Sequence, residues 1–325
     1  MADAKESALY LLAHVFNGKS LPFAQRLLRE DAVLLPSQAG AFTSLCAQRA
    51  SRVPLQYLIG SWDFSCLKDV ACRAPVLCPR PDTEDLASLA LLAARAVAPP
   101  AGGGSSLRLL DIGTGSGVIG AALLAQLPSW CGVGIDVSAA AVALARENAQ
   151  RAGVARRFSI VPSDLRDFTV VPAERFNLLV SNPPYIDSAA FVSLEPEVRL
   201  HEDPGALVGG EPRGLGLTLS ILGRAHLWAA GRGVPLFLEV DSHHPVLLHA
   251  LLEGQGAPLP WLLPGGGLGA PARAAAVAPL SAHETAQAER ALAGCSLGDL
   301  KGLWQWQQGY YCGGMLPRIV HLSLK

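Results

Sequence analysis

The sequence predicts an α/β fold in which a parallel sheet carries helices on both faces. From residue 107 onward, apolar runs typical of buried strands alternate with longer helical segments, which is the pattern of parallel strands joined by crossover helices. Polar residues end several of these runs, namely Asp111, Asp136, Asp164 and Asn182. Because the carboxyl ends of parallel strands meet along one edge of a sheet, we expect these residues to share one site.

The first part of the chain is predicted to be a small helical domain followed by a β-hairpin. Residues 4–60 contain several short helical segments, and Pro54 closes that region because proline cannot continue a helix. Alternating apolar positions such as Trp62, Phe64 and Val70 then favour a hairpin. The expected organisation is a helical substrate-binding domain over 1–60, a hairpin linker over 61–79 and a larger domain over 80–325.

The rigid, polar segment Pro79–Glu84 leads into the larger domain, and Asp82 or Thr83 is expected to cap the helix that begins there. The further elements expected in chain order are strand 107–111, helix 118–127, strand 131–136, helix 139–152, strands 158–161 and 176–180, helix 216–230, strand 234–240, helix 245–253, and the closing strands 303–307 and 318–324.

Residues 254–300 interrupt this alternation. They are rich in Gly, Ala and Pro, as in the run Pro264–Gly267, and such a composition cannot bury a core. The segment is therefore predicted to be a flexible insertion that folding does not require. One short helix is expected within it, capped by Ser281 and Glu284 in a capping box.

A glycine-rich turn follows the strand 107–111 and indicates a nucleoside cofactor. Its residues are Gly113, Thr114, Gly115, Ser116 and Gly117. Glycines let the backbone approach a ligand closely, and the start of the following helix favours electron-rich groups. Asp136 ends the next strand, and a carboxylate at that place can accept both ribose hydroxyls.

Residues 115–120 also satisfy the G-x-G-x-x-G pattern of nicotinamide dinucleotide sites. Asp111 discriminates between the two kinds of cofactor, because a carboxylate just ahead of the glycines would repel a pyrophosphate. It suits a cofactor with a cationic amino acid tail, which is S-adenosylmethionine. The predicted cofactor site comprises Asp111, Gly113–Gly117, Asp136, Asp164, Leu165 and Asn182.

The tetrapeptide Asn182-Pro183-Pro184-Tyr185 indicates methylation of a planar nitrogen. Such a nitrogen has a delocalised lone pair, so hydrogen bonding must make it nucleophilic. The Asn182 carboxamide oxygen and the Pro183 carbonyl can each accept one N–H of an –NH2 group. The two prolines hold that carbonyl still, and Tyr185 offers a flat face for stacking. The tetrapeptide is therefore predicted to be catalytic and to bind the substrate, although Asn-Pro is also a common turn signal.

Composition argues against several other kinds of protein. The 325 residues carry a net charge of −1 and a mean hydropathy of +0.30, and no apolar run reaches the length of about 18 residues that suggests a membrane span. Basic residues do not outnumber acidic ones, so the chain has no excess positive charge to neutralise a phosphate backbone. We therefore expect no direct nucleic-acid binding. Seven cysteines include no C-x-x-C pair, so no metal site is predicted. We expect a monomer.

Several motifs resemble those of the HemK-type protein N5-glutamine methyltransferases, which modify peptide-chain release factors. They lie at 54–60, 62–64, 79–84, 109–117, 180–186 and 196–207. The segment Phe237–Asp241 with His244-Pro245 is most similar to the mitochondrial branch, whereas the first residues show no presequence. Residues 254–300 lack a counterpart. The expected location is mitochondrial by resemblance and otherwise cytoplasmic.

The resemblance implies a seven-stranded class I S-adenosylmethionine-dependent methyltransferase domain of Rossmann-like type, preceded by a helical domain that grips the release factor and a hairpin hinge. It implies that Asn182 and the two prolines bind the glutamine of the release factor's Gly-Gly-Gln loop. Arg80 and Glu84 of the 79–84 motif join the predicted substrate site. Leu165 stands where many relatives carry an aromatic residue, and it is expected to weaken adenine packing.

Two other functions stay open from the sequence. N6-adenine methyltransferases of DNA or RNA use closely similar Asn/Asp-Pro-Pro-aromatic loops, but the near-neutral charge argues against them. A non-catalytic homologue that binds release factors without turnover is favoured by the insertion. The intact Asp111, Asp136, Asn182 and Tyr185 argue against it.

Overall fold

The computed structural model describes residues 2–97, 106–253, 261–262, 278–292, 295–312 and 316–325. The N-terminal elements are α1 Ala2–Val15, α2 Leu21–Arg29, α3 Pro36–Ala50, α4 Leu55–Ile59, β1 Ser61–Phe64 and β2 Leu67–Ala71. The elements of the larger domain are α5 Pro81–Ala96, β3 Leu107–Ile112, α6 Val118–Gln126, β4 Trp130–Asp136, α7 Ala139–Arg151, β5 Phe158–Pro162, β6 Leu178–Ser181, α8 Pro196–His201, α9 Gly216–Trp228, β7 Pro235–Glu239, α10 His244–Glu253, β8 Trp261–Leu262, α11 Ala282–Ala291, α12 Leu297–Leu303, β9 Trp304–Cys312 and β10 Leu316–Leu324.

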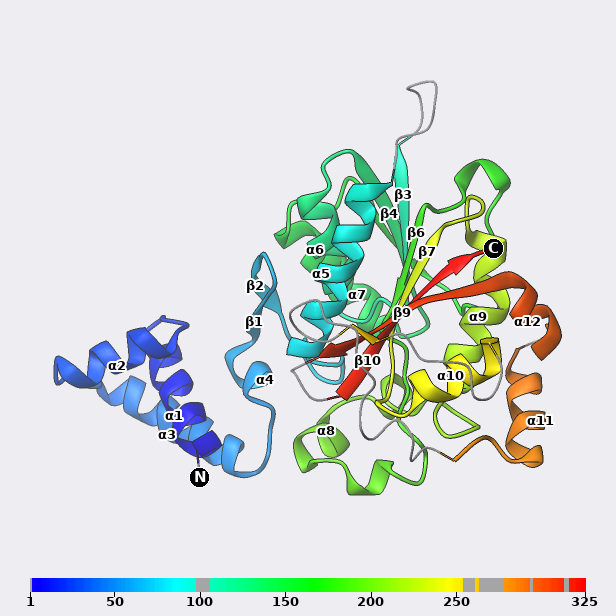
Figure 1. Ribbon diagram of the computed structural model, residues 1–325. Helices are drawn as coiled ribbons and strands as arrows, with labels where there is room; N and C mark the ends of the chain where they lie inside the picture. Colours follow the sequence, from blue (N-terminus) through cyan, green and yellow to red (C-terminus); the bar gives the residue numbers. More distant parts are fainter. Residues whose placement is uncertain (1, 98–105, 254–260, 263–277, 293–294, 313–315) are drawn as a thin grey trace.

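Helices α1 to α4 form a small cluster beside the larger domain (Figure 1). Helix α1 contacts α2, α3 and α4, and Leu11 and Leu27 lie buried between them. The hydroxyl of Ser20 caps α2 by accepting from the Phe23 N–H. Gly60 ends α4 in the left-handed conformation, which leads the chain directly into the hairpin.

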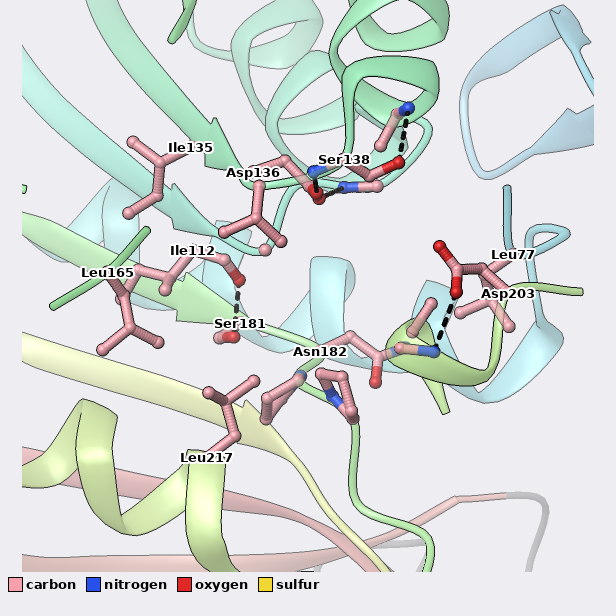
Figure 2. A pocket seen from close by; sticks show the side chains of 18 of the residues that line it. Leu77, Ile112, Ile135, Asp136, Ser138, Leu165, Ser181, Asn182, Asp203 and Leu217 are labelled. Carbon is pink, nitrogen blue, oxygen red and sulfur yellow. Dashed lines mark hydrogen bonds between the residues drawn. The ribbon is translucent and has the colours of Figure 1, made fainter. Parts of the chain in front are cut away.

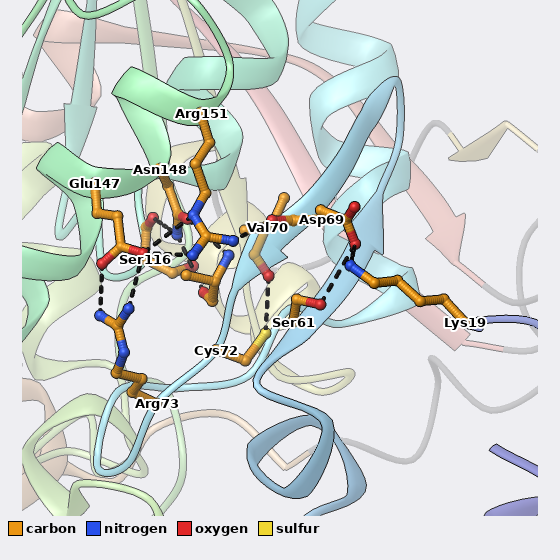
Figure 3. Close-up of polar contacts among 11 residues, drawn as sticks. Lys19, Ser61, Asp69, Val70, Cys72, Arg73, Ser116, Glu147, Asn148 and Arg151 are labelled. Carbon is orange, nitrogen blue, oxygen red and sulfur yellow. Dashed lines mark hydrogen bonds and ion pairs between the residues drawn. The ribbon is translucent and has the colours of Figure 1, made fainter. Parts of the chain in front are cut away.

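The antiparallel hairpin β1–β2 is fastened to α7 by a buried asparagine (Figure 3). The Asn148 side chain accepts from the Ala71 N–H at 2.8 Å, and it donates to the carbonyls of Ala71 at 3.2 Å and Ser116 at 2.9 Å. Arg151 donates to the Asp69 carbonyl, while Lys19 of the helical cluster pairs with the Asp69 carboxylate. The hairpin thus joins the helical cluster to the glycine turn.

The large sheet has the strand order β5-β4-β3-β6-β7-β10-β9-β8. Strands β3 to β7 run parallel, and β10 is antiparallel to both of its neighbours. The seven predicted strands are all present, and the two-residue strand β8 adds an eighth. The chain leaves β3 toward β4 and β5 and returns on its other side as β6, so the strand order reverses there, where ligands bind in such sheets.

Helices cover both faces of this sheet (Figure 1). Helices α5, α6 and α7 bury one apolar core, to which the hairpin contributes Phe64 and Leu67. Helices α9 to α12 bury the other, around Trp228 and Trp304. No helix within the described ranges is both long and apolar enough to cross a membrane.

The prediction that 254–300 is a flexible insertion is wrong for its second half. Residues 254–260, 263–277 and 293–294 lie outside the described residues. Helix α11 nevertheless packs against α9, with Ala288 and Leu292 fully buried, and Leu300 of α12 is buried as well. A Cβ at Gly223 would lie 2.6 Å from the Leu292 carbonyl oxygen, so glycine permits this close approach. The capping box of Ser281 with Glu284 is confirmed.

We therefore expect Leu292→Ala to destabilise the protein by about 3 kcal/mol, because it removes a fully buried side chain between α9 and α11. Denaturant unfolding would measure this change. Leu92→Ala, at a position 63% exposed on α5, is the control and should have little effect. Equal stability of the two variants would mean that α11 contributes little to the core.

Candidate active site

A cavity of about 370 Å³ lies at the carboxyl ends of β3, β4, β5 and β6. Figure 2 shows Ile112, Ile135 and Leu165 gathered at one end and Asn182 toward the other. Asp136 and Asp164 also line it, so the structure brings together three of the polar residues predicted at strand ends.

A second cavity of about 200 Å³ adjoins the first and contains Tyr185 in its wall. The two cavities share a set of lining residues, and this set consists of Leu77, Asn182, Pro183, Pro184 and Ala206. The tetrapeptide therefore lies between the two spaces. A cofactor on one side and an acceptor group on the other would both contact Asn182 and Pro183.

The glycine turn forms one wall of the larger cavity. Gly113, Gly115 and Gly117 all have positive φ, at 67°, 54° and 80°, a conformation that side chains disfavour. Gly113 and Gly115 line the cavity. A Cβ at Gly117 would lie 2.9 Å from the Ala145 Cβ, so this glycine serves the packing of α6 on α7.

Asp111 does not line the cavity, contrary to the prediction that it binds the cofactor directly. Its side chain is fully buried behind the turn, where Oδ2 accepts from the Thr114 hydroxyl at 2.6 Å and from the Gly120 N–H at 3.1 Å. Burial raises the pKa of Asp111 to about 6. Thr114 and Ser116 are buried as well and lie outside the lining. Asp111 and Thr114 hold the turn, and the Ser116 carbonyl accepts from Asn148.

Asp136 ends β4 at the wall of the larger cavity. Its two oxygens each accept one backbone N–H, from Gly115 and from Ser138, both at 2.9 Å. Those contacts hold the carboxylate rigidly and leave further lone pairs that can accept the hydroxyls of a ribose. Burial raises the pKa of Asp136.

The end of the cavity at Leu165 also carries Ile112 and Ile135 (Figure 2), and Leu217 and Ile221 line the cavity as well. Leu165 is 8% exposed, so its packing surface faces the cavity or its neighbours rather than open solvent. The predicted cofactor residue Asp164 forms a two-pronged ion pair with Arg166, with N–O distances of 2.9 and 2.5 Å. The Arg166 side chain is the main cause that lowers the pKa of Asp164 to about 2. This end can take a flat, largely apolar ring.

The Asn182 side chain is fixed from behind by hydrogen bonding. Its Nδ2 donates to the Thr83 hydroxyl at 3.1 Å. The carboxamide oxygen Oδ1 therefore faces away from Thr83. Pro183 is buried. A Cβ at Gly209 would lie 2.5 Å from the Pro184 carbonyl oxygen, so glycine lets the following loop support the tetrapeptide. The Asn182 side chain and the Pro184 end of the tetrapeptide are thereby held in place.

Tyr185 makes a buried polar contact that the sequence interpretation did not include. Its hydroxyl donates to Glu239 Oε1 at 3.0 Å and accepts from Arg318 at 3.4 Å. Burial, followed by the charge of Glu239, raises the pKa of Tyr185. Tyr185 lines the smaller cavity.

Of the two residues added to the predicted substrate site, Arg80 lines the smaller cavity and Glu84 lines neither of the two. The Arg80 guanidinium contacts both oxygens of Glu202, at 2.7 and 2.6 Å. Glu202 is 3% exposed and also accepts from the Cys78 N–H. This ion pair ties the segment before α5 to the end of α8.

The sequence interpretation missed Thr83 and Glu239. The expectation that Thr83 or Asp82 caps α5 is wrong, because the helix begins at Pro81 and its N-cap, Arg80, makes no side-chain capping bond. The Thr83 hydroxyl donates instead to Glu239 at 2.7 Å. A signal for Glu239 was present, since it is the last residue of β7, and polar residues at strand ends were already site candidates.

The chain matches two family models and several known proteins. Residues 82–195 match the family model of the methyltransferase small domain, and residues 1–60 match that of the PrmC N-terminal domain. The human MTRF1L release factor glutamine methyltransferase is 36% identical over 256 residues, which are 78% of this chain and 75% of that protein. The release factor glutamine methyltransferase of Cereibacter sphaeroides is 36% identical over 78% of this chain and 84% of its own length. That of Rhodospirillum rubrum is 42% identical over 57% of this chain and 53% of its own length.

Proposed function

The chain belongs to the family of release factor glutamine methyltransferases, and on that premise we propose that it methylates the glutamine side-chain nitrogen in the Gly-Gly-Gln motif of a peptide-chain release factor. The methyl donor is S-adenosylmethionine. The observation that carries the proposal is the tetrapeptide Asn182–Tyr185 at the wall between two adjoining cavities. A methyl donor in the larger cavity and a planar amide in the smaller cavity would meet at this wall.

The residues of the larger cavity fit S-adenosylmethionine. Asp136 presents a rigid carboxylate for the ribose hydroxyls, and Leu165, Leu217 and Ile221 provide apolar surface for adenine. Asp203 adds a third carboxylate to the wall, after Asp136 and Asp164, which favours a cationic ligand. When bound, S-adenosylmethionine would supply a methyl carbon for attack by the nitrogen lone pair; the bond from that carbon to the positively charged sulfur would break, the sulfur would leave as a neutral thioether, and the nitrogen would release one of its two protons to solvent.

The tetrapeptide is proposed to work by positioning the acceptor. Asn182 Oδ1 and the Pro183 carbonyl each accept one N–H of the glutamine amide, which turns the nitrogen lone pair toward the larger cavity. Tyr185 packs against the amide from the smaller cavity. These contacts need no covalent bond between the enzyme and the substrate, so catalysis depends on geometry and on preformed dipoles.

The test is intact-mass analysis of a release factor incubated with the protein and S-adenosylmethionine. We expect one added methyl group on the wild-type factor and none on a factor whose Gly-Gly-Gln glutamine is changed to alanine. Equal labelling of both factors would overturn the substrate assignment. Labelling of adenine in a nucleic acid would favour the N6-adenine alternative.

The helical cluster over residues 1–60 is proposed to grip the release factor, and residues 61–79 to act as its hinge. A polar cavity of about 310 Å³ lies between this cluster and the larger domain, with Tyr10 and Trp62 in its lining. Arg49 of α3 contacts Glu197 of α8 at 2.8 Å across it. Deleting residues 1–60 should therefore raise the KM for the release factor far more than the Kd for the cofactor.

A mitochondrial location and a monomeric state are also proposals. The location rests on the similarity of segment Phe237–Asp241 to the mitochondrial branch of the family. Imaging of the tagged natural protein against a mitochondrial marker would test it, and light scattering would test the monomer.

A further inference from the structure

We propose that Thr83 and Glu239 are positioning residues for the methyl transfer, because together they dictate which way the Asn182 carboxamide faces. The inference rests on the proposed function of Asn182 as the acceptor of a glutamine N–H. It assigns roles to two side chains that lie behind the tetrapeptide rather than in the lining of either cavity.

The side chains of half-buried Asn182 and buried Thr83 and Glu239 form a continuous hydrogen-bond relay. Asn182 Nδ2 donates to the Thr83 hydroxyl at 3.1 Å, and the Thr83 hydroxyl donates to Glu239 Oε2 at 2.7 Å. Thr83 is 4% exposed and Glu239 is 1% exposed. Water has little access to these groups, so each must find its partner within the protein.

The direction of the relay follows from the donor and acceptor capacity of each group. The Thr83 hydroxyl donates its one proton to Glu239 Oε2, and a carboxylate in its ionised form can only accept there. The Thr83 oxygen can then only accept from Asn182. Asn182 must therefore turn the –NH2 group of its carboxamide toward Thr83. Its Oδ1 then faces away from Thr83, toward the place of the substrate amide.

Neighbouring contacts hold Glu239 in place. Its other oxygen accepts from the Tyr185 hydroxyl at 3.0 Å, so both carboxylate oxygens are used. Arg318 contacts that hydroxyl and also pairs with Asp82 at 3.7 Å. Burial raises the pKa of Glu239 and the charge of Asp82 adds to this rise, while the bonds from Thr83 and Tyr185 and the charge of Arg318 oppose it in part.

The relay also connects three rigid elements. Thr83 lies in the first turn of α5, Glu239 ends β7, and Asn182 directly follows β6. Strand β6 pairs with β7, and α5 contacts both strands. A carboxamide whose hydrogen-bond partners lie on a helix and a strand keeps its orientation better than one whose partners lie on a loop.

The experiment compares Thr83→Val with Thr83→Ser, since valine has nearly the shape of threonine but no hydroxyl, while serine keeps the hydroxyl. We expect Thr83→Val to lower kcat about tenfold or more, the effect of losing one orienting hydrogen bond. Thr83→Ser should stay within about threefold of the wild type. The KM for the release factor and the Kd for S-adenosylmethionine should change little in either variant.

A double-mutant cycle separates positioning from a general structural role. If Thr83 acts through Asn182, Thr83→Val should change kcat by no more than about twofold in an Asn182→Ala background. The same tenfold loss in both backgrounds would overturn the inference. Equal kcat losses in Thr83→Val and Thr83→Ser would overturn it as well.

A readout without methyl transfer keeps the inference separate from the proposed function. Hydrogen exchange of the Asn182 side-chain amide, followed by NMR in protein saturated with S-adenosylhomocysteine, should be slow in the wild type and in Thr83→Ser and faster in Thr83→Val. Equal exchange in all three proteins would refute the relay even if release factors are methylated. Failure of the wild type to methylate any release factor would refute the proposed function, while the exchange pattern would still decide the relay.

Discussion

Asn182→Ala is expected to lower kcat by on the order of a hundredfold or more while barely changing the Kd for S-adenosylmethionine. The variant removes the oxygen that orients the acceptor amide, an interaction made chiefly in the transition state. It leaves the Asp136 end of the larger cavity intact. Steady-state kinetics with a release factor would measure kcat, and calorimetric titration would measure the Kd.

Asn182→Asp is the sharper companion variant. It keeps an acceptor oxygen toward the substrate, so some activity should survive that Asn182→Ala loses. The carboxylate cannot donate to the Thr83 hydroxyl, however, and that hydroxyl already gives its proton to Glu239. We therefore expect a kcat between those of the wild type and Asn182→Ala. A kcat of Asn182→Ala equal to the wild-type value would remove Asn182 from the mechanism.

Asp136→Ala is expected to weaken S-adenosylmethionine binding by about 2–3 kcal/mol, the order expected for losing hydrogen bonds to a charged acceptor. That corresponds to roughly 30- to 150-fold in Kd. The loss includes a contribution from the turn, because the same carboxylate accepts from Gly115 and Ser138. Calorimetric titration of S-adenosylmethionine measures the change directly.

The control for Asp136 is Asp187→Ala, which removes a carboxylate that lines neither of these two cavities and accepts from the neighbouring Ala189 N–H. Its cofactor affinity should equal that of the wild type. At saturating cofactor, Asp136→Ala should also recover much of its kcat, in contrast to Asn182→Ala. An unchanged affinity in Asp136→Ala would rule out the assignment of the ribose to this carboxylate.

Much of the fold could be predicted because its signals are local. Each buried strand needs a short apolar run, and such runs marked β3 to β7, β9 and β10. The turn at 113–117 was identifiable because glycine adopts positive φ readily, so a run of glycines indicates a turn. Asn182-Pro183-Pro184-Tyr185 was identifiable because its chemistry lies within consecutive residues. Locally encoded features of this kind did not depend on what packs around them.

Other features depended on which side of a strand or helix meets a neighbour. Asp111 stands one residue before the end of β3, and side chains alternate along a strand, so Ile112 lines the cavity while Asp111 lies behind the turn. Residues 278–292 have the composition of an exposed segment. They pack on the core because Gly223 allows α11 to approach α9 closely.

The sequence by itself determined the α/β architecture, the glycine turn and the position of the Asn182–Tyr185 tetrapeptide after a strand. Only the tertiary structure decided that Thr83 contacts Asn182 rather than capping its own helix. Thr83 and Glu239 are separated by 156 positions in the chain, and no periodicity or local propensity connects residues so far apart. They meet because β7 pairs beside β6 beneath α5, where burial obliges each polar group to find a partner that the linear sequence does not reveal.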